Sequence, residues 1–188
     1  VAVADYVLKH TPGNTVSNLS SSRALKDVTE AYGQQYHAAA VGEVNVVAEM
    51  KRTHSVIGGE GNGGVIYPES HYGRDALVGV GLFLSHYVAQ SKKMTELKST
   101  YPPYFISKNK MTLSPDMDVD KILEGLKERY ATEKVTDIDG VKIDFAQGWV
   151  HLRKSNTEPI IRIYSEAKDE AAANQLAEEV IAAAKSTL

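Results

Sequence analysis

The sequence contains no cysteine, which excludes disulfide cross-links and thiolate chemistry. A chain of this kind is compatible with a reducing compartment, and we expect it in the cytoplasm. Long apolar runs are also missing, since the longest one, residues 76–84, is too short to cross a bilayer. No secretory signal is visible either. These absences predict a protein without a membrane partner.

An excess of basic residues is missing as well. The 21 Lys and Arg residues are outnumbered by 24 Asp and Glu residues, which gives a formal net charge of −3. Binding to nucleic acid depends on neutralising phosphates, so this balance predicts no nucleic-acid partner. The apolar fraction of 43% is ordinary for a folded protein, and 188 residues lie between one and two domains on size alone.

Metal-ligand patterns are not found. The six histidines show no paired spacing and no His-Glu-x-x-His motif, which argues against zinc. Asp116, Asp118 and Asp120 lack the glycine and the terminal glutamate of a calcium loop, so we expect them to cap a helix. His71 lies a few residues after the glycine-rich loop at 58–64, which is a suspected binding site. There it is either a general acid or, more simply, a surface histidine.

Strands and helices alternate in the first hundred residues. We expect strands at 14–19, 36–41 and 55–57, and helices at 1–8, 23–32, 75–90 and directly after Gly42. The apolar residues at helical spacing are Val44, Val47 and Ala48 in the helix after Gly42, and Leu77, Val80, Gly81, Leu84 and Val88 in the helix at 75–90. This alternation predicts a layered α/β/α domain with a mainly parallel sheet.

Two adjacent prolines, Pro102 and Pro103, interrupt regular structure and predict a domain boundary. We therefore expect one domain at 1–103 and a smaller one at 104–188. In the second, the patterns predict strands at 105–113, 141–145, 149–153 and 160–164, and helices at 119–130 and near the C-terminus. This order is typical of an α+β domain with an antiparallel sheet.

The segment 153–159, with the sequence RKSNTEP, has the parts of a phosphate-binding turn between two strands. Arginine offers a planar fork that matches phosphate oxygens, and consecutive N–H groups of a turn can form an anion-binding nest. An ordinary polar hairpin turn, in which Arg153 pairs with Glu158, is the alternative. The candidate phosphate-binding side chains are Arg153, Ser155, Asn156, Thr157 and, just beyond the turn, Arg162.

A second loop, 58–64, has the sequence GGEGNGG, with five glycines in seven positions. It lacks the Gly-Lys-Ser/Thr ending of a Walker loop and the clean spacing of a dinucleotide fingerprint. Its distinctive content is Glu60 and Asn62, a carboxylate and an amide that can bind adjacent hydroxyls of a sugar. The alternative is a solvated linker in which Glu60 has no role.

Together the two loops resemble those of a known family. The sequence RKSNTEPIIR, at 153–162, resembles the phosphate-binding loop near the C-terminus of the α-D-phosphohexomutases. The loop at 58–64 is similar to their sugar-recognition loop, with Asn62 where serine is commoner. Residues 18–23 and 41–45 also resemble segments of their third domain, so the resemblance covers essentially the whole chain.

The resemblance implies domains three and four of a phosphomannomutase, phosphoglucomutase or phosphoglucosamine mutase. These isomerases move a phosphoryl group between positions 1 and 6 of a hexose through a phosphoserine, with Mg²⁺ held by an aspartate loop. Neither the serine nor the aspartate loop is found in this sequence, and a first residue, Val1, directly before a helical pattern suggests a start farther upstream. We therefore expect the chain to work with its own N-terminal domains and to bind no metal and catalyse no turnover by itself.

The same resemblance implies that the chain binds a hexose phosphate. Glu60 and Asn62 would bind the 3- and 4-hydroxyls of the sugar, and the loop after Arg153 would bind the phosphate that is not transferred. Two other functions remain open at this point: a sugar-phosphate-binding module without chemistry, and a structural scaffold. The choice among mannose, glucose and glucosamine also stays open.

Overall fold

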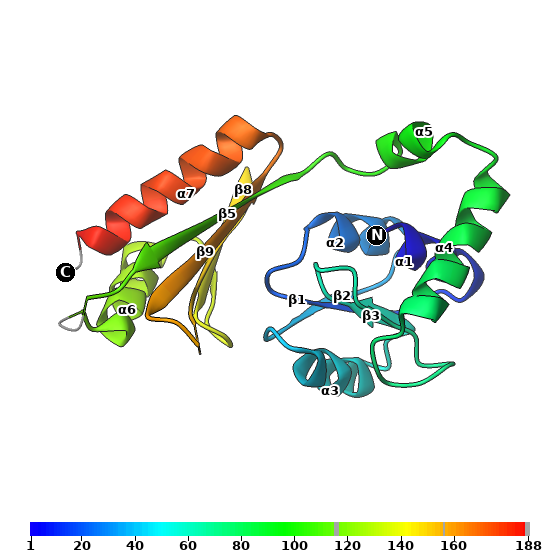
Figure 1. Ribbon diagram of the computed structural model, residues 1–188, viewed down its shortest axis with the longest axis horizontal. Helices are drawn as coiled ribbons and strands as arrows, with labels where there is room; N and C mark the ends of the chain where they lie inside the picture. The colour runs from blue at the N-terminus through cyan, green and yellow to red at the C-terminus, as the bar shows by residue number, and fades with distance from the viewer. Residues whose placement is uncertain (115–116, 156, 187–188) are drawn as a thin grey trace. The chain divides into compact units, whose positions relative to one another are not determined.

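The computed structural model describes residues 1–114, 117–155 and 157–186. The chain divides into two compact units, Val1–Pro103 and Tyr104–Leu188 (Figure 1). The division falls directly after Pro102 and Pro103, which have no backbone N–H to offer to a helix or a sheet.

The first unit contains a four-stranded sheet in the order β2-β1-β3-β4. Its strands are β1 (Thr15–Asn18), β2 (Tyr36–Ala39), β3 (Ile57–Gly59) and β4 (Val65–Ile66). The first three are parallel and β4 is antiparallel to β3, so the predicted, mainly parallel sheet is confirmed. Its helices are α1 (Ala2–His10), α2 (Ala24–Ala31), α3 (Glu43–Thr53), α4 (Ala76–Gln90) and α5 (Met94–Ser99).

Helices cover both faces of this sheet, as Figure 1 shows. On one face, α3 packs Val46 and Met50 against Val16 of β1. On the other face, α1 places Ala4 and Val7 against Ile57 of β3, and α2 and α4 add further apolar side chains. The two clusters make the α/β/α layering that the alternation of strands and helices predicts.

Of the three residues on the predicted apolar side of α3, only Val47 packs against the core. Val44 is 81% exposed and Ala48 is exposed, whereas Val46 and Met50 are fully buried. Apolar residues occur on several sides of this helix, so spacing alone does not select the side that meets the sheet.

The helix α4 begins where expected, with the Asp75 carboxylate accepting a hydrogen bond from the N–H of Val78. Its apolar stripe nevertheless faces outward: Leu77 is 84% exposed and Val88 is 73% exposed. The helix has no charged residue on any side, so its sequence does not reveal which face is packed.

A cluster of polar side chains joins three helices of the first unit to the segment before the two prolines. The Asp5 carboxylate accepts hydrogen bonds from the hydroxyls of Tyr32 at 2.6 Å and Tyr101 at 2.8 Å. The Tyr101 oxygen lies 2.7 Å from Nε2 of the buried His86. Because the Tyr101 proton goes to Asp5, His86 is the donor in that contact. The residue next to Pro102 is thereby fixed to the first unit.

The second unit contains a five-stranded sheet in the order β5-β9-β8-β7-β6, with every neighbouring pair antiparallel. Its strands are β5 (Phe105–Thr112), β6 (Lys134–Thr136), β7 (Val141–Phe145), β8 (Gly148–Lys154) and β9 (Ile160–Ala167). Its helices are α6 (Val119–Arg129) and α7 (Glu170–Lys185). The predicted α+β fold with an antiparallel sheet is confirmed.

Both helices of this unit pack on one face of the sheet. Their apolar residues, among them Ile122 of α6 and Val180 of α7, form one core with Ile143, Leu152 and Ile163. Side chains alternate between the two faces of a strand, so the neighbours of these core residues lie on the face opposite α6 and α7. That opposite face holds the candidate phosphate-binding arginines.

Aspartates begin both helices of the second unit. Asp118 accepts hydrogen bonds from the N–H groups of Asp120 and Lys121, which confirms its predicted capping role, and Asp169 caps α7. Asp116 lies outside the described residues. None of the helices in the described part of the chain has the length and apolar character needed to cross a membrane.

The polar cluster around Asp5 predicts that its removal weakens the first unit. We expect Tyr101→Phe to lower the free energy of unfolding by about 1–3 kcal/mol, because Asp5 and the buried His86 both lose a partly buried hydrogen-bond partner. The control is Tyr72→Phe, since Tyr72 is exposed and contacts Lys51 through its ring. Urea unfolding followed by circular dichroism measures both, and equal midpoints for the two variants would contradict the prediction.

The same cluster predicts a loss of stability at high pH. Burial, with the bond to Asp5, raises the pKa of Tyr32 from 10.0 to about 12. A tyrosine in the unfolded chain loses its proton near pH 10, so the stabilisation is complete below that value and disappears as the pH rises to about 12. Urea midpoints across this range should fall less steeply in Tyr32→Phe than in the wild type. If the midpoints of the two proteins fell equally steeply with pH, Tyr32 would not be the source of the loss of stability.

Candidate functional site

The glycine-rich loop at 58–64 forms a tight turn between β3 and β4. The N–H of Glu60 donates to the carbonyl of Gly64 at 2.9 Å, and the N–H of Gly63 donates to the carbonyl of Glu60 at 3.0 Å. Gly63 has a φ of +94°, which favours glycine, and a side chain at Gly59 would collide with the carbonyl of Gly64. These glycines therefore shape the loop.

Glu60 is held inside this loop. Its side chain is 6% exposed, and it accepts a hydrogen bond from Nδ2 of Asn18 at 3.0 Å and an ion pair from Arg74 at 3.2 Å. Asn18 ends β1 and Glu60 directly follows β3. The carboxyl ends of neighbouring parallel strands meet at one edge of a sheet, which is where ligands commonly bind in such folds. Glu60 is thus an oriented carboxylate and not part of a solvated linker.

Arg74 joins two carboxylates at this edge. Its backbone N–H and its Nε both donate to Glu43 at 2.8 Å, while its NH1 contacts Glu60. The backbone hydrogen bond, followed by the guanidinium, lowers the pKa of Glu43, so that carboxylate stays charged. Arg74 thereby links the loop at 58–64 to the start of α3.

Asn62 lies at the tip of the loop and is exposed. Its Oδ1 accepts a hydrogen bond from the N–H of Gly64 at 3.0 Å. With the oxygen engaged in this way, the amide nitrogen is the end that is suited to contact a ligand.

His71 lies in the segment between β4 and α4. Its Nε2 is 3.1 Å from Asp75, the residue that caps α4, and the side chain is 51% exposed. This environment supports the simpler of the two interpretations, a surface histidine.

The candidate phosphate-binding turn connects β8 to β9. Ser155 is buried, and its N–H donates to the carbonyl of Ile160 at 2.9 Å. Its hydroxyl oxygen lies 3.4 Å from the N–H of Thr157 and 3.3 Å from that of Glu158. Two consecutive N–H groups therefore converge on one point, as in an anion-binding nest, and the Ser155 hydroxyl occupies that point. Asn156 lies outside the described residues.

Arg153 pairs with Asp139, and its expected alternative pairing with Glu158 is not formed. The Nε of Arg153 is 3.2 Å from Oδ2 of Asp139, whereas Glu158 lies 3.5 Å from NH2 of Arg162. A contact through Nε fixes one edge of the Arg153 guanidinium and leaves the terminal nitrogens as the fork that suits a phosphate.

The turn that carries Asp139 is itself fixed from two sides. Burial lowers the pKa of His151 to about 4, so this histidine is neutral. Its Nε2 lies 2.7 Å from the Asp139 carbonyl and must donate, because a carbonyl can only accept. Gly140 has a φ of +67°, and a side chain there would collide with the carbonyl of Leu152.

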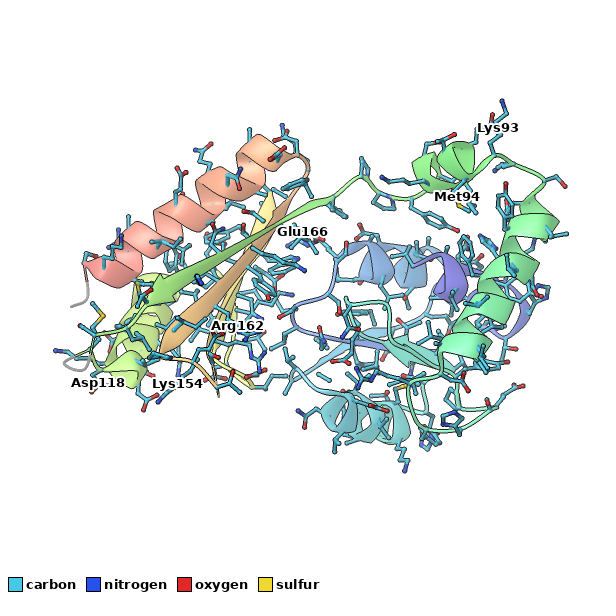
Figure 2. All side chains as sticks on the ribbon, viewed as in Figure 1. Lys93, Met94, Asp118, Lys154, Arg162 and Glu166 are labelled. Atoms are coloured by element: carbon cyan, nitrogen blue, oxygen red, sulfur yellow. The ribbon has the colours of Figure 1, made fainter. Side chains whose placement is uncertain are left out.

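A row of three cations crosses the sheet beside this turn. Arg153 of β8 is opposite Arg162 of β9, and Arg162 is opposite Lys110 of β5. Residues directly opposite each other on neighbouring strands have their side chains on the same face. In Figure 2, Arg162 lies at the end of β9 that is nearer to Lys154, and Glu166 lies toward the other end.

The predicted residues thus form two groups, one in each unit. Glu60 and Asn62 share the loop of the first unit. In the second unit, Ser155 and Thr157 lie in the β8–β9 turn, and Arg153 and Arg162 lie on the strands beside it. Sequence reasoning missed Asn18, Glu43 and Arg74. For the first two, a signal was available, since each is the polar residue at or after the end of a parallel strand. Among the described residues, no group of three or more His, Asp or Glu side chains could hold a metal ion.

Comparison with known proteins matches both units. Residues 1–104 match the family model described as phosphoglucomutase/phosphomannomutase, alpha/beta/alpha domain III. Residues 108–183 match the phosphoglucomutase/phosphomannomutase C-terminal domain.

Two curated relatives are similar to most of this chain. A phosphoglucosamine/phosphogalactosamine mutase of Sulfurisphaera tokodaii is 36% identical, over 88% of this chain and 37% of that protein. A phosphoglucomutase/phosphomannomutase of Thermococcus kodakarensis is 37% identical, over 94% of this chain and 39% of that protein. The chain therefore spans about two fifths of the length of these relatives.

Solved structures share the fold of the chain. A phosphoglucomutase/phosphomannomutase family protein of Burkholderia thailandensis aligns with a TM-score of 0.77 at 23% identity, covering 98% of this chain and 40% of that one. An N-acetylphosphoglucosamine mutase of Aspergillus fumigatus, solved with GlcNAc-6P and magnesium, aligns with a TM-score of 0.62 at 14% identity, covering 99% and 42%. The resemblance expected from the two loops is confirmed, and the chain belongs to the phosphoglucomutase/phosphomannomutase family, with its domain III followed by its C-terminal domain.

Proposed function

We propose that this chain is the substrate-binding half of a phosphohexomutase, an isomerase that interconverts hexose 1-phosphate and hexose 6-phosphate. The observation that carries the proposal is that Arg153 and Arg162 lie opposite each other on β8 and β9, next to a turn whose two convergent N–H groups orient the Ser155 hydroxyl. Two arginines beside an oriented hydroxyl suit a phosphate group. Membership of the phosphoglucomutase/phosphomannomutase family supports a hexose as the molecule that carries this phosphate.

In the second unit, the phosphate would bind to the β8–β9 turn. Asp139 holds one edge of Arg153, which presets the direction of the fork before the ligand arrives. The Ser155 oxygen accepts N–H contacts from the turn, so its own proton remains to donate to a phosphate oxygen. Thr157 is exposed at the same turn and supplies a second hydroxyl.

In the first unit, the sugar would bind to the loop at 58–64. Each carboxylate oxygen of Glu60 already accepts one contact, from Asn18 or from Arg74, and has a further lone pair for a sugar hydroxyl. The Asn62 amide can donate to the oxygen of a neighbouring hydroxyl. A carboxylate that accepts and an amide that donates suit a pair of adjacent hydroxyls on a hexose.

Chemistry would require the N-terminal half of a full-length enzyme. We place the phosphoserine and the Mg²⁺ there, as the resemblance to the α-D-phosphohexomutases implies. The ion would neutralise charge on the phosphoryl group when bound. The contribution of this chain is positioning, which lowers the barrier by aligning the substrate before transfer.

The phosphate site predicts a specific loss of affinity. We expect Arg153→Gln to weaken the binding of glucose 1-phosphate to the 188-residue chain by about 1.5–3 kcal/mol, because a charge-assisted contact is removed. Arg129→Gln is the control, since that exposed arginine at the end of α6 contacts Ser186 instead. Isothermal titration calorimetry measures both affinities.

Equal affinities of the two variants would argue against this site. The same sample should not convert glucose 1-phosphate into glucose 6-phosphate, since we assign the phosphoserine to the other half of the enzyme. Turnover by a pure sample would contradict the division of labour between the two halves. A wild type that does not respond to glucose 1-phosphate would instead favour a structural scaffold.

The sugar loop predicts a loss that depends on the sugar. We expect Glu60→Gln to reduce the affinity for glucose 1-phosphate by about tenfold, because a charged acceptor is lost, and to leave the affinity for inorganic phosphate unchanged. Glu69→Gln is the control, as Glu69 is an exposed carboxylate in the segment after β4. An equal loss of affinity for both ligands in Glu60→Gln would refute a sugar-specific role.

A further inference from the structure

The row of cations beside the β8–β9 turn ends at a lysine, Lys110. Lys110 of β5 lies directly opposite Arg162, and its neighbour Met111 belongs to the core under α6 and α7. Lys110 is therefore on the face opposite those helices, together with Arg162 and Arg153.

Lys110 also lies close to the turn itself. The strand β5 runs along the exit of the turn, where the N–H of Leu113 donates to the carbonyl of Pro159 at 2.9 Å. Neighbouring strands are about 4.8 Å apart, so Lys110 is one strand from Arg162 and about 10 Å from Arg153 at the backbone. Its flexible four-carbon stem can bring the ammonium group to a ligand bound between the two arginines.

The charges of the row are not balanced. Asp139 pairs with Arg153 at 3.2 Å and Glu158 lies 3.5 Å from Arg162. Within residues 1–114, 117–155 and 157–186, no acidic side chain pairs with Lys110. Like charges opposite each other on neighbouring strands are destabilising, so the row has an excess positive charge that an anion would relieve.

We propose that Lys110 is a third cation of the phosphate site and binds the phosphate group of the substrate together with Arg153 and Arg162. The inference rests on the proposed function and adds a binding residue to it. Lysine is a compact point charge, whereas the Arg153 fork fixes orientation. Lys110 thus contributes affinity for a dianion, and the arginines set its direction.

Lys108 provides a matched comparison. It lies two residues earlier on the same strand and on the same face, but it is opposite Tyr164, and its ammonium group lies 5.5 Å from the centre of that ring. The two lysines have equal charge and belong to the same strand. They differ in their distance from the turn. A difference in ligand affinity between the two variants therefore reflects contact with the ligand and not the change in net charge.

The test uses the 188-residue chain with inorganic phosphate and with glucose 1-phosphate as ligands. We expect Lys110→Gln to weaken both affinities by about five- to twentyfold, and Lys110→Arg to restore most of the loss. Lys108→Gln should stay within about twofold of the wild type. Without ligand, Lys110→Gln should unfold at the same or a higher temperature, because the repulsion opposite Arg162 is relieved.

Three results would overturn the inference while leaving the proposed function intact. These are an unchanged affinity in Lys110→Gln, an equal loss in the two lysine variants, and a lower unfolding temperature without a loss of affinity. The last result would assign Lys110 to folding. A wild type that binds neither ligand would overturn the proposed function and, with it, the role of Lys110.

Discussion

The pairing of β8 with β9 is the constraint on which the second unit depends. It directs Leu152 and Ile163 into the core and, on the other face, sets Arg153 opposite Arg162. A shift by one residue would exchange the two faces of the strand. Burying an isoleucine contributes about 1.5–3 kcal/mol, whereas an unfavourable cross-strand pair costs about 0.2–1 kcal/mol. Core packing therefore holds like charges together at the turn, in positions that a bound anion can use.

In the first unit, the charge that must be stabilised is negative. Glu60 is a nearly buried carboxylate, and such a charge is tolerated only when it is paired and hydrogen-bonded. Arg74 provides the ion pair, and Glu43 in turn fixes the direction of Arg74. The parallel strands bring these groups to one edge although they are far apart in the sequence. The Glu60 carboxylate is thus paired, hydrogen-bonded and fixed in direction without a ligand.

Much of this could be predicted from local patterns. The helices at α4 and α7, the strands β7 and β8 and the two loops follow from periodicity, glycine and charge near a turn. The short strands β4 and β6 escaped because two or three residues show no period. The packed faces of α3 and α4 were not predicted because each helix has apolar residues on several of its own sides. Lys110 and Arg74 could not be found in this way, since the position of Lys110 opposite Arg162 follows from strand register and the ion pairs of Arg74 join separate segments, and both are non-local.

The two loops therefore differ in what they can contribute to recognition. In the loop at 58–64, Glu60 shares Arg74 with Glu43, so each of these charges already has a partner and further contacts there depend on geometry and desolvation. The turn near Arg153 has surplus positive charge on a sheet face, so its attraction for an anion acts over a longer range and is screened by salt. Under the proposed function, the phosphate supplies most of the affinity and the sugar loop supplies most of the discrimination. A substrate that must present either of its ends to one phosphoserine is served by this division, because the phosphate contacts do not depend on which carbon carries the group.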